Sequence, residues 1–368
     1  MRILQVGKFP KEHCGGVENA VFSLSEALAR DHDVEVVTSS LDAGAGESRS
    51  GRLLCRRLPT WFKFFSTPFT PALVGTLRRA PAFDVVQVSF QNPMAVLAYL
   101  LARPQGRLVV WYHHDIVRQR FLGRLLSPVI DIMLTRASRI VATSSAYALS
   151  SPVLSRFPEK TEVIPLGVDL APFQAPEALA QAREIRARHG RPLVLFIGRL
   201  VYYKGLPYLI EAMRDLDADL LIIGQGPWET RLRAQAQSLG SAARIEFLRV
   251  ARGQSLAPYL HACDLLALPS TERTEAYGLV QLEAMACGKP VVATELGTGT
   301  SFVCQHGVTG LVVPPRDPAA LRQAIGSLLA DPARAQRMGR EGRKRVEEHF
   351  TIRQMADAFV KLYERLPC

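Results

Sequence analysis

Two glutamates separated by seven residues stand in the stretch TERTEAYGLVQLEAMACGKP, residues Thr271–Pro290. Glu275 comes just before Gly278, and Glu283 follows within apolar residues at helical spacing, which predicts a helix ended by a glycine. Free N–H groups at the start of such a helix bind anions, and a glycine there lets the ligand approach closely. Carboxylates would repel a phosphate, so we expect them to contact hydroxyls such as those of a sugar. The plain alternative is an amphipathic helix with an exposed glutamate at each end.

The neighbouring residues indicate where this helix lies in a fold. A strand-like run, residues 264–270, precedes it, and another, residues 290–295, follows it. The order strand, loop, helix, strand places the start of the helix at the carboxyl edge of a parallel sheet, where such sheets bind ligands. The amides expected to bind an anion are those of Gly278, Leu279 and Val280.

Two other loops in this half of the chain follow strands. GRLVYYKG, residues 198–205, carries Arg199 and Lys204, which suit a diphosphate because arginine binds as a fork and lysine as a point charge. GTGTS, residues 297–301, offers more backbone N–H groups and hydroxyls. Three loops therefore offer partners to phosphates or hydroxyls, and this convergence favours a ligand site.

The first half of the chain begins with a similar arrangement. A strand-like run at residues 3–7 and the loop KFPKEHCGG lead into a helical pattern from Val17 to Arg30. Gly15 and Gly16 stand just before that helix, which is phosphate-binding geometry, although neither a P-loop nor a dinucleotide fingerprint is present. A plain turn is the alternative.

A pair of histidines ends another expected strand, residues 107–114. His113 or His114 at the carboxyl end of a strand can donate to a substrate oxygen or act as an acid or base. A structural or capping role is the alternative.

Strand and helix patterns alternate in both halves of the chain, which predicts two parallel-sheet α/β domains. The join falls in a stretch rich in Pro, Gly and Ala near residues 167–177. We therefore expect domains at residues 1–168 and 169–349, with a last helix in residues 350–368.

The composition is that of an ordinary globular protein, with 48% hydrophobic and 21% charged residues in 368. No apolar run is long enough to span a membrane, and the N-terminus lacks the core of a secretory signal. Six scattered cysteines without a C-x-x-C pair indicate free thiols in a reducing cytoplasm. The D-x-D in DLDAD, residues 215–219, lies at the edge of the sheet away from the ligand, so we interpret it as a solvated turn and predict no metal site.

The net charge of +11 is concentrated in one quarter of the chain. Residues 49–139 contain fourteen Lys and Arg against three acids, which accounts for the whole excess and suits an anionic partner. Within it, residues 56–79 mix five aromatic residues (Trp61, Phe62, Phe64, Phe65 and Phe69) with five basic ones. Such a segment either lies on an anionic membrane surface or buries its aromatics in the core.

The chain resembles a family 4 retaining glycosyltransferase of the GT-B fold over almost its whole length. The motifs that carry the resemblance are the Gly15–Gly16 loop, FIGRLVYYKG, IIGQGP, DLLALPS, the Glu275 to Glu283 spacing and GVTGLVVPPRD. It implies two Rossmann-like parallel-sheet domains facing across a cleft. The first would bind the acceptor and the second a nucleotide-diphosphate sugar, and the last helix would pack back on the first.

The resemblance also implies a role for each site residue. Arg199 and Lys204 would hold the diphosphate, Glu283 the ribose hydroxyls, and Glu275 the donor-sugar hydroxyls near the reacting carbon. The loop at Gly15 and Gly16 would close over phosphate and sugar, and His113 would be the active-site histidine. The remaining residues expected to bind the nucleotide sugar are Val250, Tyr277, Gly278, Leu279 and Val280. Two departures from the family pattern are a missing glycine in IEFLRVARG and a tyrosine, Tyr277, in place of phenylalanine.

The segments YYKG and GTGTS resemble those of bacterial O-antigen mannosyl- and rhamnosyltransferases. This resemblance favours a GDP-sugar over a UDP-sugar as the donor. The implied enzyme needs neither cofactor nor metal, acts on a lipid-linked glycan in cell-surface polysaccharide synthesis, and lies on the inner face of the cytoplasmic membrane. One alternative is another GT-B enzyme, such as a nucleotide-sugar epimerase or a phosphorylase. A nucleic-acid binder is the other, but no motif for nucleic-acid binding supports it.

Overall fold

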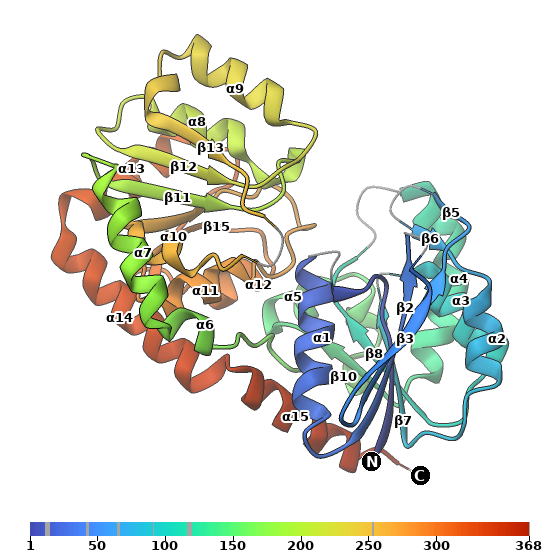
Figure 1. Cartoon of the computed structure of the whole chain (residues 1–368). Helices are drawn as coiled ribbons and strands as arrows, with labels where there is room; N and C mark the ends of the chain where they lie inside the picture. Colours follow the sequence, from blue (N-terminus) through green and yellow to red (C-terminus); the bar gives the residue numbers. More distant parts are fainter. Residues whose placement is uncertain are drawn as a thin grey trace. The chain divides into compact units, whose positions relative to one another are not determined.

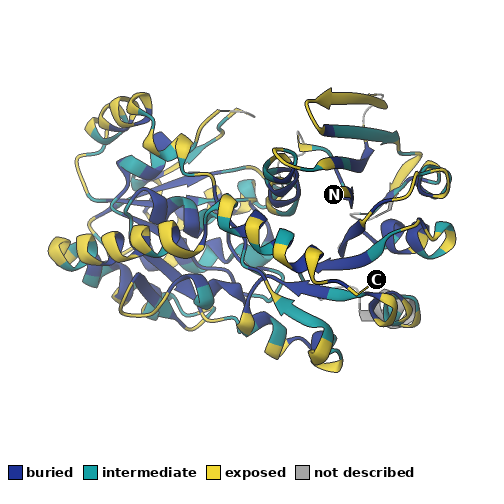
Figure 2. Ribbon diagram, turned by 90° about the horizontal axis from the view of Figure 1, so that it is seen from below, coloured by how far each residue is buried: buried dark blue, intermediate teal, exposed yellow. Residues whose placement is uncertain are grey.

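A computed structural model describes residues 1–11, 15–41, 44–64, 67–90, 92–115, 120–251 and 254–367. The chain forms two compact units. Unit 1 contains residues 1–167 together with the C-terminal segment from Ile352 onward, and unit 2 contains Val168–Thr351. In both units most strands are buried and the outward sides of the helices are exposed, whereas the strand at Gly46–Ser50 is exposed along its whole length (Figure 2).

Unit 1 is built on an eight-stranded sheet with the order β10-β9-β8-β7-β1-β2-β4-β3. All neighbours are parallel except β3 and β4. The strands are β1 (Arg2–Val6), β2 (Asp33–Ser40), β3 (Gly46–Ser50), β4 (Leu53–Pro59), β7 (Val85–Phe90), β8 (Arg107–Tyr112), β9 (Arg139–Ala142) and β10 (Thr161–Val163). A separate antiparallel hairpin pairs β5 (Phe62–Phe64) with β6 (Thr67–Phe69).

Helices cover both faces of this sheet (Figure 1). They are α1 (Gly16–Leu28), α2 (Ala72–Arg78), α3 (Pro93–Ala102), α4 (Arg120–Arg136), α5 (Ser145–Ser150) and α15 (Ile352–Glu364). Helix α15 is amphipathic and lies beside α1, where its Phe359 ring meets Trp111 of β8 at 5.0 Å. The Tyr363 hydroxyl donates to Gln87 of β7 at 2.5 Å, so the last helix of the chain belongs to the core of unit 1.

The strands and helices expected from the sequence are present in unit 1, with three differences. GAGESRSG was expected to be a loop, but Gly46–Ser50 pairs with β4 as an antiparallel edge strand. The expected strand at residues 161–169 is limited to Thr161–Val163. The aromatic segment forms a hairpin, which needs two paired strands and is not visible in hydrophobic periodicity. The expected features at Phe65, at residues 12–14 and at the start of the basic helix near Arg118 lie outside the described residues.

Unit 2 has a six-stranded, fully parallel sheet with the order β13-β12-β11-β14-β15-β16. Its strands are β11 (Leu193–Ile197), β12 (Asp219–Ile223), β13 (Ile245–Leu248), β14 (Leu265–Leu268), β15 (Val291–Thr294) and β16 (Gly310–Val313). Its helices are α6 (Ala171–Gln174), α7 (Pro176–Ala187), α8 (Leu206–Met213), α9 (Glu229–Ser238), α10 (Ala257–Ala262), α11 (Val280–Ala286), α12 (Gly299–Val303), α13 (Pro318–Ala330) and α14 (Pro332–His349).

The strands of unit 2 are apolar on both faces because helices cover both faces. Phe196 and Ile222 point into one core with α8, α9 and α13, where Leu209 and Ile325 are fully buried. On the other face, α10 packs against α7 and α11. Burial of so many aliphatic side chains is the main term that stabilises the unit, at about 25 cal/mol per Å² of apolar surface.

Both sheets share the doubly wound order in which the first strand lies in the middle. The chain moves outward from β1 to β2 and β4, then returns to β7 on the other side of β1. In unit 2 the same reversal separates β11 from β14. At such a switch point the loops after the two central strands diverge to opposite faces and leave a crevice for a ligand.

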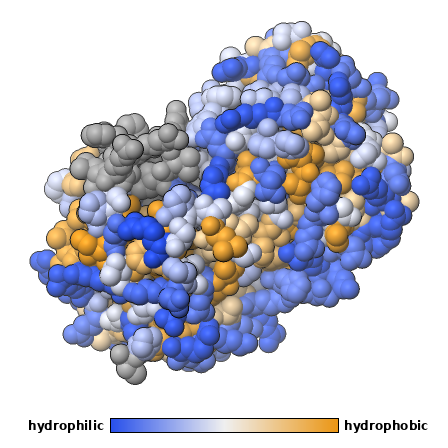
Figure 3. Space-filling model, turned by 180° about the vertical axis from the view of Figure 1, so that it is seen from behind, coloured by the Kyte–Doolittle hydropathy of each residue, from blue (hydrophilic) through white to orange (hydrophobic). Residues whose placement is uncertain are grey.

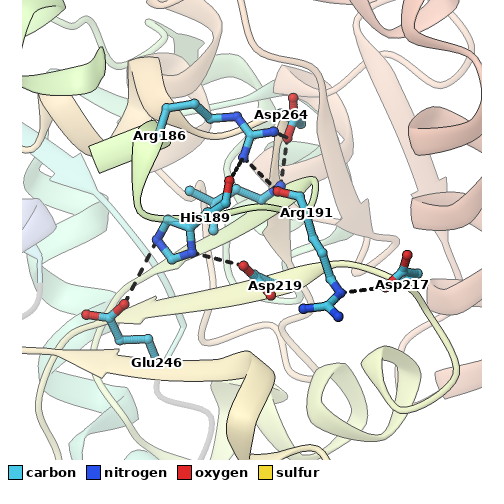
Figure 4. A network of polar contacts seen from close by, with 8 residues as sticks. Arg186, His189, Arg191, Asp217, Asp219, Glu246 and Asp264 are labelled. Atoms are coloured by element: carbon cyan, nitrogen blue, oxygen red, sulfur yellow. Dashed lines mark hydrogen bonds and ion pairs between the residues drawn. The ribbon is translucent and has the colours of Figure 1, made fainter. Parts of the chain in front are cut away.

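The opposite, amino edge of the unit 2 sheet is held by ion pairs (Figure 4). His189 lies between Asp219, 3.0 Å from its Nδ1, and Glu246, 4.0 Å from its Nε2. Arg191 pairs with Asp217 at 2.6 Å, and a third aspartate, Asp215, pairs with arginines. The DLDAD segment therefore lies on the edge away from the switch point, as expected, but each of its aspartates has a basic partner.

Three further properties bear on function: the length of the helices, the polarity of the surface and the state of the cysteines. Among the described helices, none is long and apolar enough to cross a membrane. On the face drawn in Figure 3, hydrophilic side chains cover most of the surface and apolar ones form smaller areas between them. Four cysteines (Cys55, Cys263, Cys287 and Cys304) are free thiols.

Candidate active site

The loop after β11 is shaped by one glycine. Gly205 has a φ of +69°, and a Cβ built on it would lie 1.8 Å from the carbonyl oxygen of Pro269. Only glycine adopts this conformation and this approach without strain. The close contact brings the short turn Tyr202–Lys204 against the end of β14, where Thr271 N donates to Tyr203 O at 2.7 Å. The loops on the two sides of the switch point are therefore joined.

This contact places Lys204 against Glu275. The Lys204 ammonium lies 2.5 Å from Glu275 Oε2, and only 12% and 10% of the two side chains are exposed. Ser270 Oγ donates to the same carboxylate oxygen at 2.9 Å. Burial acts to lower the pKa of Lys204, but the Glu275 carboxylate outweighs it, so the pKa lies above its usual value. The Lys204 ammonium therefore stays charged at neutral pH.

Residues of the loop after β15 hold the backbone of Glu275, the acid of the Lys204–Glu275 pair. The buried Thr298 hydroxyl donates to the backbone oxygen of Glu275 at 2.8 Å, and Thr300 Oγ1 donates to Thr294 O at 3.1 Å. We expected the GTGTS hydroxyls to face a ligand. The hydroxyls of Thr298 and Thr300 instead donate to backbone carbonyls, because these residues are fully buried against the Glu275 loop.

The predicted amides are available at the start of α11. Gly278 has a φ of +73°, and the backbone N–H groups of Gly278, Leu279 and Val280 have no acceptor within the described part of the chain. Tyr277 is buried and packs against Gly299, so its side chain supports the loop. Three unsatisfied donors in consecutive residues are the chemistry an anion requires.

Glu283 lies within α11 and has no partner among the described residues. Burial alone raises the pKa of this carboxyl to about 7. A carboxylate that is half-buried without a partner is costly to maintain, and such groups gather at functional sites. Its oxygens can accept hydrogen bonds from hydroxyls of a ligand.

Two other predicted residues of unit 2 lie on the carboxyl side of the sheet. Arg199 is exposed. Val250 is half-buried just after β13, two strands away from β11. A shallow pocket of about 470 Å³ around Arg337 and Arg340 of α14 shares no residue with this group.

The remaining predicted residues belong to unit 1. Gly15 caps α1, and the Glu18 carboxylate lies where a Cβ of Gly15 would stand, 1.9 Å away, so an acid already occupies the start of this helix. His113 follows β8 and is 2% exposed, with its ring centroid 4.6 Å from that of Trp111. Its Nε2 has no hydrogen-bond partner among the described residues, and burial lowers its pKa to about 3. His113 is therefore a neutral, buried imidazole.

The loop that carries His113 is anchored by Asp115. The Asp115 carboxylate accepts hydrogen bonds from Ser151 at 2.6 Å, Tyr112 at 2.8 Å and Tyr147 at 3.1 Å. The neighbouring His114 points its Nδ1 at the Asp115 backbone oxygen, 2.8 Å away. Of the two histidines, only His113 keeps a ring nitrogen that is buried without a partner.

The structure thus joins Lys204 and Glu275 directly and puts Arg199, Gly278 and Glu283 on the same edge of one sheet. Sequence reasoning missed the supporting residues Ser270, Gly205 and Thr298. The signals that could have found them are the glycine after YYK, the serine that ends DLLALPS and the threonines of GTGTS.

Two family models match the chain and divide it much as the two units do. Glycosyltransferase Family 4 matches residues 14–172, and Glycosyl transferases group 1 matches residues 179–345. The computed fold agrees with solved GT-B structures. Sucrose-phosphate synthase from Thermosynechococcus elongatus is similar over 100% of this chain and 99% of its own, with a TM-score of 0.83 and 25% identity. Anabaena HepE, solved in complex with UDP, has a TM-score of 0.80 and 20% identity over the whole of both chains.

The curated relatives cover nearly all of the chain. D-rhamnosyltransferase WbpZ of Pseudomonas aeruginosa is 36% identical over 95% of this chain and 92% of its own. O-antigen chain mannosyltransferase C of Escherichia coli is 34% identical over 100% and 99%. A GDP-mannose-dependent alpha-(1-6)-phosphatidylinositol monomannoside mannosyltransferase of Mycolicibacterium smegmatis is 32% identical over 93% and 92%. The protein has the GT-B fold, is a glycosyltransferase, and belongs to glycosyltransferase family 4.

Replacing Gly205 by alanine should damage both stability and the Lys204–Glu275 pair. Gly240 is the matched control, since its φ of +67° is nearly the same but nothing lies within 4 Å of its added Cβ. Gly240→Ala should cost about 1 kcal/mol for the left-handed conformation alone. Gly205→Ala should cost more than about 2 kcal/mol, because the Pro269 carbonyl must also move. Urea unfolding measures both free energies, and equal losses would contradict this role of Gly205.

The raised pKa of Glu283 predicts that this residue weakens folding as pH rises. An unfolded glutamate ionises near 4.5, whereas folded Glu283 holds its proton to about pH 7. Its contribution is therefore fully present below pH 4.5, is lost as pH rises to about 7, and amounts to at most about 3 kcal/mol.

Glu283→Gln removes this titration, so the free energy of unfolding of the variant relative to wild type should increase from pH 5 to pH 8. The exposed Glu211→Gln on α8 is the control and should show no such trend. A pH-independent difference between wild type and Glu283→Gln in urea unfolding would refute the buried, unpaired carboxyl.

Proposed function

We propose that this glycosyltransferase moves a hexose of the mannose or rhamnose type from a nucleoside-diphosphate sugar to a lipid-linked glycan, with retention of anomeric configuration. GDP is the favoured nucleotide and UDP the alternative. The observation that carries the proposal is the largely buried Lys204–Glu275 pair at the switch point of unit 2, on the same sheet edge as the free amides that start α11. Cations, amides and carboxylates together match the parts of a sugar nucleotide.

Each group then has a distinct partner on the donor. Lys204 and Arg199 neutralise the diphosphate, and the amides of Gly278 to Val280 donate to its oxygens. Glu275 accepts hydrogen bonds from the sugar hydroxyls, and Glu283 accepts them from the ribose hydroxyls. The contact between Lys204 and Glu275 holds both side chains in place before the donor arrives, so little reorganisation accompanies the reaction.

The bonds exchange on one face of the sugar. The acceptor hydroxyl oxygen forms a bond to the anomeric carbon, the bond from that carbon to the diphosphate oxygen breaks, and the electron pair leaves with the diphosphate. The hydroxyl proton passes to an oxygen of the leaving phosphate. No protein nucleophile is required, and the negative charge that develops on the diphosphate is stabilised by Lys204, Arg199 and the helix amides.

Unit 1 would bind the acceptor. His113 supplies a neutral imidazole whose Nε2 is buried without a partner, which suits a hydrogen bond to a sugar hydroxyl. The loop at Gly15 and Gly16 would cover the phosphate and sugar, which requires Glu18 to leave the start of α1. The enzyme would need neither metal nor cofactor, since its fixed cations take the role that a divalent ion has in other phosphate chemistry.

The names of the relatives support the proposed donor and acceptor. The relatives are named for mannosyl or rhamnosyl transfer, one for GDP-mannose, and one for the O-antigen chain, a cell-surface polysaccharide. A lipid-linked acceptor requires the enzyme to work at the inner face of the cytoplasmic membrane, and the basic region 49–139 would favour an anionic lipid surface. Part of that charge is neutralised inside unit 1, because Arg56 pairs with Glu35 and Glu47.

Removing both charges of the Lys204–Glu275 pair should abolish most sugar transfer while the protein keeps most of its folding stability. Lys204→Met or Glu275→Leu alone leaves one buried charge unpaired, which costs about 3–5 kcal/mol, whereas the double variant should regain most of that stability. All three variants should lose at least about 100-fold in turnover, because the charges act on the donor. Unfolding free energies and sugar-transfer rates measure the two effects. A double variant with near wild-type transfer would overturn the assignment.

The nucleotide can be identified by thermal shift. GDP should raise the melting temperature more than UDP or ADP at equal concentration, because only a ligand that binds the folded state stabilises it. Arg199→Ala should reduce this shift by weakening diphosphate binding, whereas Arg183→Ala, an exposed arginine of α7, should leave it unchanged. Equal shifts in the two variants would argue against Arg199 as a diphosphate ligand.

A further inference from the structure

A pocket of about 470 Å³ lies between helix α14 and the turn that precedes β16. A volume of this size is in the range of pockets that take small molecules. Three arginines of the helix line it, together with a single acid, so its charge is positive. The lining residues that matter here are Val308, Arg334, Arg337, Met338, Arg340 and Glu341.

The backbone on both sides of the pocket is fixed by close contacts. A Cβ on Gly339 of α14 would lie 1.9 Å from the carbonyl oxygen of Gly288, so only a glycine lets the helix approach this closely. In the turn, Thr309 N donates to Gln305 O at 3.0 Å, and Gln305 N donates to Thr309 Oγ1 at 2.9 Å. The helix and the turn therefore hold the lining residues in place.

Other basic residues of α14 have acidic partners on the same helix. Arg343 lies 2.8 Å from Glu347, and Lys344 lies 4.0 Å from Glu348. Each acid follows its base by four residues, which is the usual spacing of ion pairs on a solvated helix face. Such pairs need no ligand to neutralise them.

The arginines that line the pocket have no such partner. In the described part of the chain, which includes all of residues 254–367, neither Arg334, Arg337 nor Arg340 forms an ion pair. Glu341 follows Arg337 by four residues, the same spacing as Arg343 and its acid, but no ion pair joins them. Residues three apart are neighbours on a helix surface, so three guanidinium groups without acids line one pocket.

The remaining lining residues add an apolar wall. Val308 is 47% exposed although it is a large aliphatic residue, and Met338 is buried beneath the arginines of its helix. An arginine fork binds a phosphate through two parallel hydrogen bonds, which suits it better than a lysine to this anion. The pocket therefore offers partners both to a phosphate group and to a carbon skeleton attached to it.

We propose that this pocket binds a soluble, phosphorylated small molecule of the sugar phosphate class. Arg334, Arg337 and Arg340 hold its phosphate, and Val308 contacts its carbon skeleton. The site is separate from the one proposed for the donor, because the donor amides start α11, whereas α14 contacts Gly288 beyond the end of that helix. The inference uses neither donor nor acceptor and so stands apart from the proposed function.

A series of fructose phosphates tests the pocket on the full chain. Calorimetry should rank fructose 1,6-bisphosphate tightest and fructose 6-phosphate next, and fructose should show no binding, because the arginines bind phosphate. Inorganic phosphate should bind more weakly than fructose 6-phosphate, since it lacks the carbon skeleton. Absence of fructose 1,6-bisphosphate binding would overturn the proposal, and so would inorganic phosphate that binds as tightly as fructose 6-phosphate.

Variants on the same helix locate the bound phosphate. Arg337→Ala should weaken fructose 1,6-bisphosphate about tenfold, since a charge-assisted contact is lost. Arg343→Ala is the matched control, because Arg343 is also an exposed arginine of α14 but is paired with Glu347, and it should change the affinity less than twofold. Equal losses in the two variants would mean that only net charge matters and would contradict the site.

A second comparison separates this pocket from the donor site. Arg337→Ala should leave the thermal shift by GDP unchanged, and Arg199→Ala should leave the affinity for fructose 1,6-bisphosphate unchanged. A loss of bisphosphate binding in Arg199→Ala but not in Arg337→Ala would place the sugar phosphate in the donor site and refute the proposal. Because the two ligands are measured separately, failure of the GDP shift leaves the bisphosphate result intact, and the reverse also holds.

A lipid headgroup is the other source of a phosphate group. Vesicles of phosphatidylglycerol and of phosphatidylcholine distinguish it from a soluble ligand. Binding to phosphatidylglycerol vesicles that Arg337→Ala abolishes, without any binding of fructose 1,6-bisphosphate, would show that the arginines face a membrane and would overturn the soluble ligand. We expect fructose 1,6-bisphosphate to bind in the absence of vesicles.

Discussion

The ion pair between Lys204 and Glu275 is the interaction on which the rest of the site depends. Its two partners come from loops that follow β11 and β14, and these strands are neighbours only because the sheet reverses its order there. Two charges this deeply buried are stable only with good geometry and further hydrogen bonds. Ser270 supplies one of these bonds, and Thr298 fixes the backbone of Glu275.

The unit 2 sheet separates structural charges from functional ones. At its amino edge, His189 and the aspartates of DLDAD are paired with one another or with arginines, and these pairs bind the starts of the strands together. At its carboxyl edge, Glu283 and the first amides of α11 have no partner within the described residues. Unsatisfied groups are costly in an empty protein, so their gathering on one edge indicates where a charged ligand belongs.

Unit 1 repeats the sheet order but not the chemistry. Its carboxyl edge presents the neutral His113, a pair of lysines over Phe9 and an exposed aromatic hairpin, and the Asp115 carboxylate is fully used in holding its loop. The same architecture therefore carries charged side chains and unpaired amides at this edge in one unit, and a neutral histidine with exposed aromatic side chains in the other.

The alternation of strands and helices was predictable from the sequence, because strands that are buried on both faces consist of continuous apolar runs. The glycine at residue 278 and the spacing of Glu275 and Glu283 were equally readable, since backbone conformation and helix periodicity are local properties. Tertiary structure decided which groups are free. The Thr298 hydroxyl is consumed by a backbone carbonyl, His113 is buried neutral, and GESRS becomes an edge strand by pairing with β4. A side chain's partners come from distant segments, and no local pattern records whether a polar group has already found one.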